Sequence, residues 1–304
     1  MDLVILAAGM GSRFGGLKQI EPIDEFNNFI IDYTIYDAKK AGFDKVIFII
    51  KKENYDIFKQ TIGKRVEARI KTEYCFQTLD LIPEGYSLPK DRVKPLGTAQ
   101  AILAAKDLVS DKFIIINADD YYGADAFMVA ANYLKNLKTK KGAYANVGYK
   151  VINTITDNGS VKRGVLYFDK NNKLTKLVES NIEKVNGKII ASPLDDENNK
   201  TEISKDTLVS MNMFCFTKDI MDRLEEGFKP FMEENKNNLA KCEYLIPTVV
   251  SDLINKGEAT CDILSTTAVW YGVTYKEDKD FVVNSLKALV EAGNYPKGLW
   301  KDQK

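Results

Sequence analysis

The chain has 304 residues, of which 45% are hydrophobic and 28% charged, a composition typical of a globular protein with a sizeable core. Basic and acidic residues number 43 each, so no net charge favours binding to nucleic acid or to an anionic membrane. The chain contains no histidine, which excludes Ser-His-Asp and Cys-His catalysis and every zinc site that uses histidine.

Cysteines and apolar runs bear on the location of the protein. The cysteines lie far apart and form no CxxC pair: Cys75, Cys215, Cys242 and Cys261. This pattern predicts reduced core thiols in a cytoplasmic protein. Met1 leads directly into a short apolar segment, so we expect no signal peptide. No apolar run approaches the ~20 residues of a membrane helix, so we expect no membrane contact.

The first half of the chain alternates apolar runs with amphipathic segments. The pattern predicts strands over residues 3–8, 45–50 and 112–117, and helices over residues 30–41, 54–62 and 99–107. Strands that are apolar on both faces and separated by helices indicate a parallel sheet that is covered on both sides. We therefore predict an α/β fold with a mostly parallel, Rossmann-like central sheet and helices on both faces.

The second half is richer in strands. The pattern predicts strands over residues 163–168, 174–178 and 208–216, a strand-like segment over 266–275, and helices over 220–226, 244–256 and 278–292. Residues 182–207 are polar, and we interpret them as a surface excursion. We expect one continuous α/β domain in which residues 1–145 form the core and residues 146–304 form a β-rich lobe and C-terminal elements.

The glycine-rich stretch "LAAGMGSRFGGLKQ", residues 6–19, directly follows the first predicted strand. A dinucleotide fingerprint requires GxGxxG, but Phe14 occupies the third glycine position, and Lys51 and Lys52 stand where a ribose-binding acid belongs. A Walker loop requires GxxxxGK[ST]; here Leu17 precedes Lys18, and the hydroxyl residue is absent. A plain glycine turn accounts for the glycines but not for the basic residues.

The remaining hypothesis is a loop that wraps around a nucleoside triphosphate. Backbone N–H groups at Ala8, Gly9 and Gly11 can approach phosphate oxygens, and Arg13 and Lys18 supply charge-assisted donors. The loop resembles the signature of the sugar-phosphate nucleotidylyltransferase superfamily, which makes nucleoside-diphosphate sugars and related activated alcohols. The resemblance implies that this arginine and this lysine bind the triphosphate and act in catalysis.

Further segments extend the resemblance to the base. "PLGTAQAI" at residues 95–102 resembles the GTA segment of the family, which implies that Gly97 and Thr98 lie beside the base. Gln77 resembles the glutamine that binds the base edge; its amide both donates and accepts, so uracil and cytosine both remain candidates. From the residues alone, Thr98 is expected to be a helix N-cap, and Gly97 to allow a base to lie against the backbone.

"IIINADDYYG" at residues 114–123 places two carboxylates, Asp119 and Asp120, after an apolar strand. Ligands of open α/β folds bind at the carboxyl edge of the sheet, and Mg²⁺ prefers carboxylate and phosphate oxygens. We therefore predict a magnesium site at this pair, the alternative being an Asp-rich turn or helix cap. By resemblance, Asp119 is the metal-binding aspartate. Members that activate sugars usually carry a second metal aspartate where this chain has Gly272.

The segments "SVKRGVL", "KLVES", "LVSMNMFCF" and "WYGVTY" follow in family order. The resemblance implies that Arg163 binds the acceptor phosphate, Gly164 and Glu179 its hydroxyls, and Asn212 a ring substituent. The alternative for Lys162 and Arg163 is a solvated strand end. The short spacing from Arg13 to Lys18 resembles members that use CTP with small or non-sugar alcohol phosphates.

Together these features predict a nucleotidyltransferase that transfers NMP from a pyrimidine triphosphate (CTP, UTP or dTTP) to a sugar phosphate and releases pyrophosphate. Its partners are a nucleoside triphosphate, Mg²⁺ and a phosphorylated small molecule. The alternatives are a cytidylyltransferase for phosphocholine or a phosphonate, and a catalytically silent nucleotide sensor. A glycosyltransferase usually shows a DxD motif, whereas Tyr121 stands at the third place here. Base, acceptor and oligomeric state stay open at this stage.

Overall fold

A computed structural model describes residues 1–9, 22–138, 141–272 and 278–300. Its strands are β1 (Asp2–Leu6), β2 (Lys45–Ile50), β3 (Lys71–Phe76), β4 (Lys112–Asn117), β5 (Asp120–Tyr121), β6 (Ala143–Lys150), β7 (Val161–Phe168), β8 (Leu174–Val185), β9 (Lys188–Pro193), β10 (Thr201–Ile203), β11 (Leu208–Thr217), β12 (Thr260–Thr266) and β13 (Tyr271–Gly272). Its helices are α1 (Ile30–Ala41), α2 (Tyr55–Phe58), α3 (Lys64–Glu67), α4 (Thr98–Leu103), α5 (Ala124–Asn136), α6 (Ile220–Glu234), α7 (Ile246–Asn255) and α8 (Asp278–Glu291), with short helical turns η2 (Lys52–Asn54), η3 (Lys59–Gly63) and η4 (Val151–Asn153).

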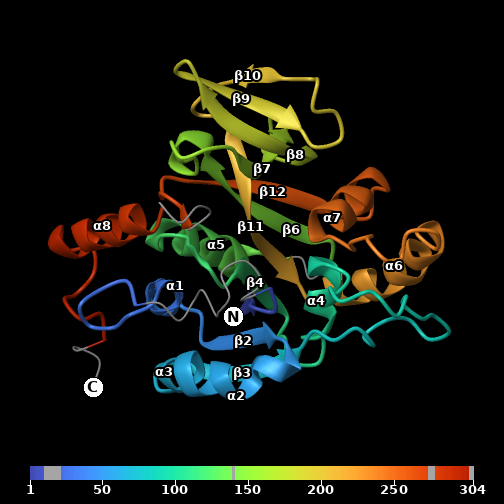
Figure 1. Cartoon of the computed structure of the whole chain (residues 1–304), viewed down its shortest axis with the longest axis horizontal. Helices are drawn as coiled ribbons and strands as arrows, with labels where there is room; N and C mark the ends of the chain where they lie inside the picture. Colours follow the sequence, from blue (N-terminus) through green and yellow to red (C-terminus); the bar gives the residue numbers. More distant parts are fainter. Residues whose placement is uncertain (10–21, 139–140, 273–277, 301–304) are drawn as a thin grey trace.

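One 11-stranded sheet runs through the molecule in the order β10-β9-β8-β7-β11-β4-β1-β2-β3, with β6 pairing with β11 and β12 (Figure 1). The strands β3, β2, β1 and β4 are parallel. The strands that join them to the β-rich lobe pair antiparallel. Helices cover both faces of the parallel core. The predicted fold class, an α/β sheet with a β-rich lobe, is confirmed.

Both faces of the parallel strands are buried. Leu3 and Ile5 of β1 pack in the cluster that contains residues of α1 and α5, whereas Val4 packs in the cluster that contains residues of α4, α6 and α7. The same alternation holds in β4, where Ile114 faces α1 and α5 and Phe113 faces the other helices. A strand buried on both faces reads as a continuous apolar run, which is why β1 and β4 were recognisable in the sequence.

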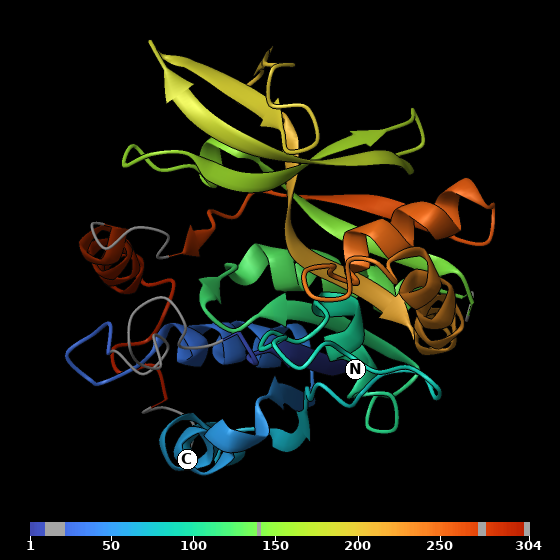
Figure 2. The same cartoon turned by 45° about the vertical axis from the view of Figure 1, so that its right-hand side comes forward.

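The antiparallel lobe formed by β7, β8, β9 and β10 extends away from the core (Figure 2). The expectation of a surface excursion over residues 182–207 is wrong, because this range contains the end of β8, all of β9 and all of β10. The β8–β9 hairpin turns at Asn186 and Gly187, whose φ angles are 51° and 79°. Positive φ at both positions is the geometry of the two-residue hairpin turn. The polar residues of this hairpin alternate with Ile182, Ile189 and Ala191, which are buried and pack in the same cluster as residues of α1 and α5.

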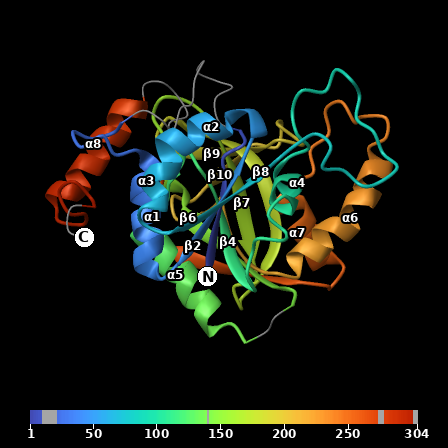
Figure 3. The same cartoon turned by 90° about the horizontal axis from the view of Figure 1, so that it is seen from below.

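The C-terminal part of the described chain packs against α1 on the side opposite α6 (Figures 1 and 3). The hydroxyl of Tyr295 donates to Asp37 Oδ2 at 2.6 Å and hydrogen-bonds with the hydroxyl of Tyr121 at 2.7 Å. The ring of Tyr121 stacks on Tyr271, with 5.4 Å between centroids. The C-terminal segment thus contacts the small β5–β13 sheet, which follows β4.

Asp37 is expected to make stability depend on pH. Burial raises the pKa of its carboxyl from 3.8 to about 7, so the folded state favours the protonated form. The stability that this group contributes is complete below pH 4 and is lost as the pH rises through 7. Asp37→Asn should therefore reduce the fall in unfolding free energy between pH 5 and pH 8 by about 2 kcal/mol. Urea unfolding at both pH values measures this; the exposed Asp56→Asn is the control and should leave the pH dependence unchanged.

All four cysteines are free and buried. Burial raises the pKa of the Cys75 thiol to about 12 and that of the Cys215 thiol further, which keeps both thiols protonated and unreactive. These observations agree with the prediction of reduced core thiols. Within the described ranges, none of the helices has the length and apolar character that crossing a membrane requires.

Candidate active site

The parallel strands place several predicted residues at one edge of the sheet. Past the strand ends, Ala7 donates to the carbonyl of Ile49 at 2.8 Å, and Ala118 to that of Leu6 at 3.1 Å, so the ladder continues toward this edge. Gln77 follows β3 and Asp119 follows β4 at the same edge. The carboxyl edge of parallel strands is where open α/β sheets bind ligands.

Ala8 and Gly9 leave β1 at this edge, Ala8 buried and Gly9 exposed. The remainder of the predicted triphosphate loop, including Gly11, Arg13 and Lys18, lies outside the described residues. The roles assigned to these three residues remain predictions from the sequence.

Gln77 lies beside the start of α4. Its Nε2 donates to the carbonyl of Gly97 at 3.0 Å and to Gln100 Oε1 at 2.8 Å, so both amide N–H groups are used within the protein. Its Oε1 accepts no hydrogen bond from the described residues. A side-chain atom without a hydrogen-bond partner either reaches solvent or is buried and unpaired. In the described chain, the buried and unpaired side-chain atoms are Asn146 Oδ1 and Trp270 Nε1. Oε1 of Gln77 is not one of them, so it reaches solvent.

Thr98 does not cap α4, contrary to the sequence expectation. The N-cap position belongs to Gly97, and no side chain caps it. The hydroxyl of Thr98 instead accepts from the backbone N–H of Ile246 at 3.1 Å, at the start of α7. The threonine therefore connects the two helices. No sequence pattern indicates α7 as the partner of Thr98, because the two lie far apart along the chain.

Gly97 is constrained by the protein itself. Its φ is 104°, and a Cβ added there would lie 2.7 Å from the carbonyl oxygen of Tyr244. The backbone groups of Tyr244 hydrogen-bond with Leu96 and Ala99 on either side. The need for glycine therefore comes from backbone conformation and from the close approach of this segment.

Replacing Gly97 by alanine should destabilise the fold by about 2 kcal/mol or more, because it combines backbone strain with a clash. Urea unfolding measures the effect. Gly85→Ala is the matched control, since Gly85 also has a positive φ of 88° but no atom within 4 Å of its Cβ position. Equal losses in the two variants would contradict the contribution of the Tyr244 contact.

The two predicted metal carboxylates differ in their surroundings. Asp119 is half-buried, and its carboxylate receives no hydrogen bond from the described residues. Asp120 is buried, and its Oδ2 lies 2.9 Å from the donor Asn117 Nδ2 and 3.3 Å from the hydroxyl of Tyr122. Burial, together with the charge of Asp119, raises the pKa of Asp120 to about 7. Asp119 is therefore the more available carboxylate, and Asp120 is the more rigidly held one.

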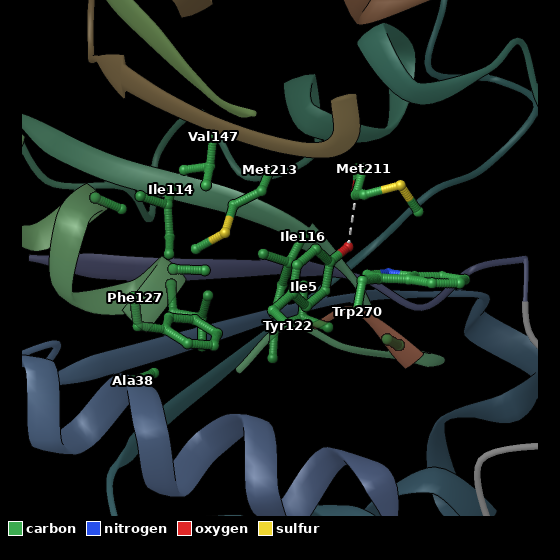
Figure 4. Packing of buried hydrophobic residues seen from close by; sticks show 14 of the residues in the cluster. Ile5, Ala38, Ile114, Ile116, Tyr122, Phe127, Val147, Met211, Met213 and Trp270 are labelled. Atoms are coloured by element: carbon green, nitrogen blue, oxygen red, sulfur yellow. Dashed lines mark hydrogen bonds between the residues drawn. The ribbon is translucent and has the colours of Figure 1, made fainter. Parts of the chain in front are cut away.

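Tyr122 anchors this turn inside the core. Its hydroxyl accepts from the backbone N–H of Asn117 at 2.9 Å and lies 3.2 Å from the carbonyl oxygen of Met211. Figure 4 shows Tyr122 beside Ile5 and Ile116. The dashed line joins its hydroxyl to Met211, and Trp270 lies nearby. The turn that carries the carboxylates is thereby joined to β11.

The strand β13 explains the departure at Gly272. Gly272 pairs with Asp120 in the β5–β13 ladder. A Cβ built on Gly272 overlaps the ring of Trp270, so this backbone has no room for a side chain. The guanidinium of Arg163 also lies over the Trp270 ring, 4.5 Å from the ring centroid. The space next to Gly272 is filled by the tryptophan, and Asp120 is the carboxylate opposite it.

The predicted acceptor residues lie on neighbouring strands. Gly164 of β7 pairs with Ser210 of β11 and with Glu179 of β8. Asn212, with a φ of 61°, lies in the irregular part of β11, and its Nδ2 donates to Asn117 Oδ1 at 3.0 Å. Asn117 thus connects Asn212 to Asp120. The prediction missed Asn117, although a polar residue at the end of an apolar strand was a signal for it.

Arg163 is buried rather than a solvated strand end, whereas Lys162 is exposed. The Nε and Nη2 of Arg163 donate to the carbonyl of Thr154, and its Nη1 donates to the carbonyl of Lys162. Burial lowers the pKa of Arg163 to about 10, which still keeps the guanidinium charged near neutral pH. Of the five N–H groups of an arginine, these bonds leave two for a ligand.

Comparisons with known proteins bear on the family and the fold of the chain. A family model described as "Nucleotidyl transferase" matches residues 3–300. The bifunctional protein GlmU of Bacillus licheniformis is 24% identical over 300 residues, which cover 97% of this chain and 52% of that protein. The chain thus spans about half the length of this curated relative.

Solved structures share the fold. The inositol-1-phosphate CTP transferase from T. maritima has a TM-score of 0.62 at 13% identity, covering 95% of this chain and 96% of the other. A putative glucose-1-phosphate thymidylyltransferase from Bacillus anthracis has a TM-score of 0.59 at 16% identity, covering 94% of both chains. A UDP-glucose pyrophosphorylase complexed with UDP-glucose has a TM-score of 0.55 at 15% identity, covering 94% of this chain and 98% of the other.

Proposed function

The chain belongs to the nucleotidyl transferase family, and from this premise we propose that it transfers NMP from CTP, UTP or dTTP to a sugar phosphate and releases pyrophosphate. The observation that carries the proposal is the arrangement of Gln77, Asp119 and Asn212 along one edge of the sheet. In this arrangement residues 1–145 bind the nucleotide and residues 146–304 form the acceptor-binding lobe and the C-terminal elements.

The nucleotide side would use the backbone of Ala8, Gly9 and Gly11 for the phosphates, and Gln77, Gly97 and Thr98 for the base. Arg13 and Lys18 would bind the triphosphate, a role supported by the resemblance of the loop. The carbonyl of Gln77 supports this proposal, since it is the one amide group of that side chain without a partner among the described residues.

The acceptor side would use Arg163 for the phosphate, Gly164 and Glu179 for hydroxyls, and Asn212 for a ring substituent. The two remaining N–H groups of Arg163 suit a phosphate oxygen. Asn212 has one amide hydrogen bond to Asn117, which leaves its carbonyl for a substrate donor.

The residues at Asp119 and Asp120 fit Mg²⁺, which typically binds through one or two carboxylates together with phosphate oxygens. Asp119 would be the principal ligand because no described group hydrogen-bonds to its carboxylate. Asp120 would be the second, with Oδ2 held by Asn117 and Tyr122. The ion, when bound, would neutralise charge on the triphosphate.

The chemistry proposed for the protein is positioning and charge stabilisation. A phosphate oxygen of the acceptor attacks the α-phosphorus of the triphosphate, the new P–O bond forms, and the bond to the pyrophosphate oxygen breaks. A phosphate monoester is already anionic near neutral pH, so the reaction needs no general base, in agreement with a chain that lacks histidine. Lys18 would stabilise charge at the α-phosphate and Arg13 charge on the leaving pyrophosphate.

The test is a pyrophosphate-release assay with Mg²⁺ that crosses CTP, UTP and dTTP with hexose 1-phosphates and amino-alcohol phosphates. Release that depends on one triphosphate and one sugar phosphate supports the proposal. Release that depends on phosphocholine or a phosphonate would identify the alternative acceptor class. Triphosphate binding without release from any acceptor would instead indicate a nucleotide sensor.

Two observations weigh on the wider proposal. A quaternary ammonium acceptor is commonly bound on an open aromatic face, but Arg163 already covers Trp270, so this ring does not favour phosphocholine.

Free, buried thiols are typical of proteins in a reducing compartment, and we place the reaction in the cytoplasm on that ground.

A further inference from the structure

Gln100 is a buried polar residue of α4 to which the sequence assigned no role. Its side chain is 0% exposed, yet every polar atom of its amide has a partner. Nε2 donates to the carbonyls of Thr78 at 2.8 Å and Leu81 at 3.0 Å. Oε1 accepts from the backbone N–H of Leu96 at 3.1 Å and from Gln77 Nε2. Since backbone carbonyls accept only, and the N–H of Leu96 donates only, the amide of Gln100 has one allowed orientation.

The orientation of Gln100 determines that of Gln77. The Nε2 of Gln77 lies between two acceptors, Gln100 Oε1 at 2.8 Å and the carbonyl of Gly97 at 3.0 Å. If the amide of Gln77 were reversed, its carbonyl would face both acceptors, and two buried hydrogen bonds would be lost. Gln77 therefore presents its carbonyl, not its N–H₂ group, toward the open side of the site.

We propose that Gln100 is a positioning residue that sets base specificity: by fixing Gln77, it makes the site select nucleotides whose base edge donates a hydrogen bond. The inference rests on the proposed function, because it takes the open side of Gln77 as the base site. The amino group of cytosine and the N3–H of uracil or thymine both meet this requirement. A pyrimidine without a donor at that edge would leave the carbonyl of Gln77 unpaired.

The test measures triphosphate binding by calorimetry, with Mg²⁺ present and acceptor absent. Whichever of CTP, UTP and dTTP binds is compared with an analogue that lacks the donor: 4-deamino-CTP for CTP, or the N3-methyl nucleotide for UTP and dTTP. Wild-type protein should bind the parent nucleotide about 10- to 100-fold more tightly than the analogue. Gln100→Met, which has a similar volume but no polar group, should reduce this ratio several-fold, because only the carbonyl of Gly97 then holds the amide of Gln77 in this orientation.

Two further variants separate orientation from stability. Gln100→Glu keeps an acceptor for Gln77 and Leu96, so it should retain the ratio even where stability falls. Ile102→Ala removes apolar contacts of the same helix, and it should lower stability without changing the ratio. If Gln100→Met does not fold, the ratios of the wild type and of Gln100→Glu decide the proposal.

A wild-type protein that binds parent and analogue equally would overturn the inference, and so would a Gln100→Met variant that keeps the full ratio. The proposed function fails separately: discrimination between nucleotides without pyrophosphate release from any acceptor would support the role of Gln100 and contradict transfer. Absence of binding by every triphosphate would overturn both.

Discussion

Replacing Asp119 by asparagine is expected to lower the rate of pyrophosphate release by about 10²- to 10³-fold and to raise the Mg²⁺ concentration needed for half-maximal rate. Asparagine keeps the size and one oxygen of the side chain but removes the charge. The carboxylate of Asp119 accepts no hydrogen bond from described residues, so the substitution should cost little stability. Steady-state rates over a series of Mg²⁺ concentrations, with unfolding curves for the same samples, measure both effects.

Two aspartates serve as comparisons for Asp119. Asp107→Asn changes an exposed carboxylate outside the site and should leave rate and Mg²⁺ dependence unchanged. Asp120→Asn should also raise the Mg²⁺ concentration needed for half-maximal rate, and it should alter stability, because Asp120 is buried and bonded to Asn117 and Tyr122. If Asp119→Asn kept the wild-type Mg²⁺ dependence, the assignment of this residue as a metal ligand would be wrong.

Much of the sheet could be predicted from the sequence because burial on both faces leaves uninterrupted apolar runs. The predicted bounds of α1, β2 and β4 agree with the structure. The helix α5 was missed even though Ala126, Ala130 and Leu134 are buried at helical spacing, a pattern that the sequence contained. The strands β9 and β10 were missed for a different reason: the buried residues of β9, such as Ile189 and Ala191, are few and lie within a long polar stretch, so the range resembles a surface loop.

The part of the candidate site that could be predicted consists of residues whose own type indicates a chemical role. The places of Asp119, Gln77 and the start of the glycine loop could be predicted because each follows a strand that ends at one edge of the sheet, whereas the base-binding role of Gln77 rests on the family resemblance and stays a prediction. The residues that orient them could not, since Gln100 acts on Gln77 from α4, and Tyr122 on Asp120 through the core. The blocked space at Gly272 also depends on the ring of Trp270, which no spacing rule gives.

Replacing Lys18 by alanine is expected to lower turnover by about 10²-fold or more, the usual consequence of removing a group that stabilises developing charge. The prediction rests on the loop motif, since Lys18 lies outside the described residues. A lysine contributes a mobile point charge that can follow negative charge onto the α-phosphate as the bond to pyrophosphate breaks. Its contribution should therefore appear more in kcat than in the KM for the triphosphate.

The matched variants distinguish this catalytic role from triphosphate binding alone. Lys18→Arg keeps the charge but not its compact geometry, so it should recover part of the lost turnover. Lys64→Ala, at an exposed lysine of α3, should behave as the wild type. A Lys18→Ala variant with unchanged kcat and a raised KM would assign Lys18 to ground-state binding of the triphosphate, and wild-type turnover would remove it from the site. Because the chain has no histidine to act in its place, no imidazole can compensate for the lost cation in these assays.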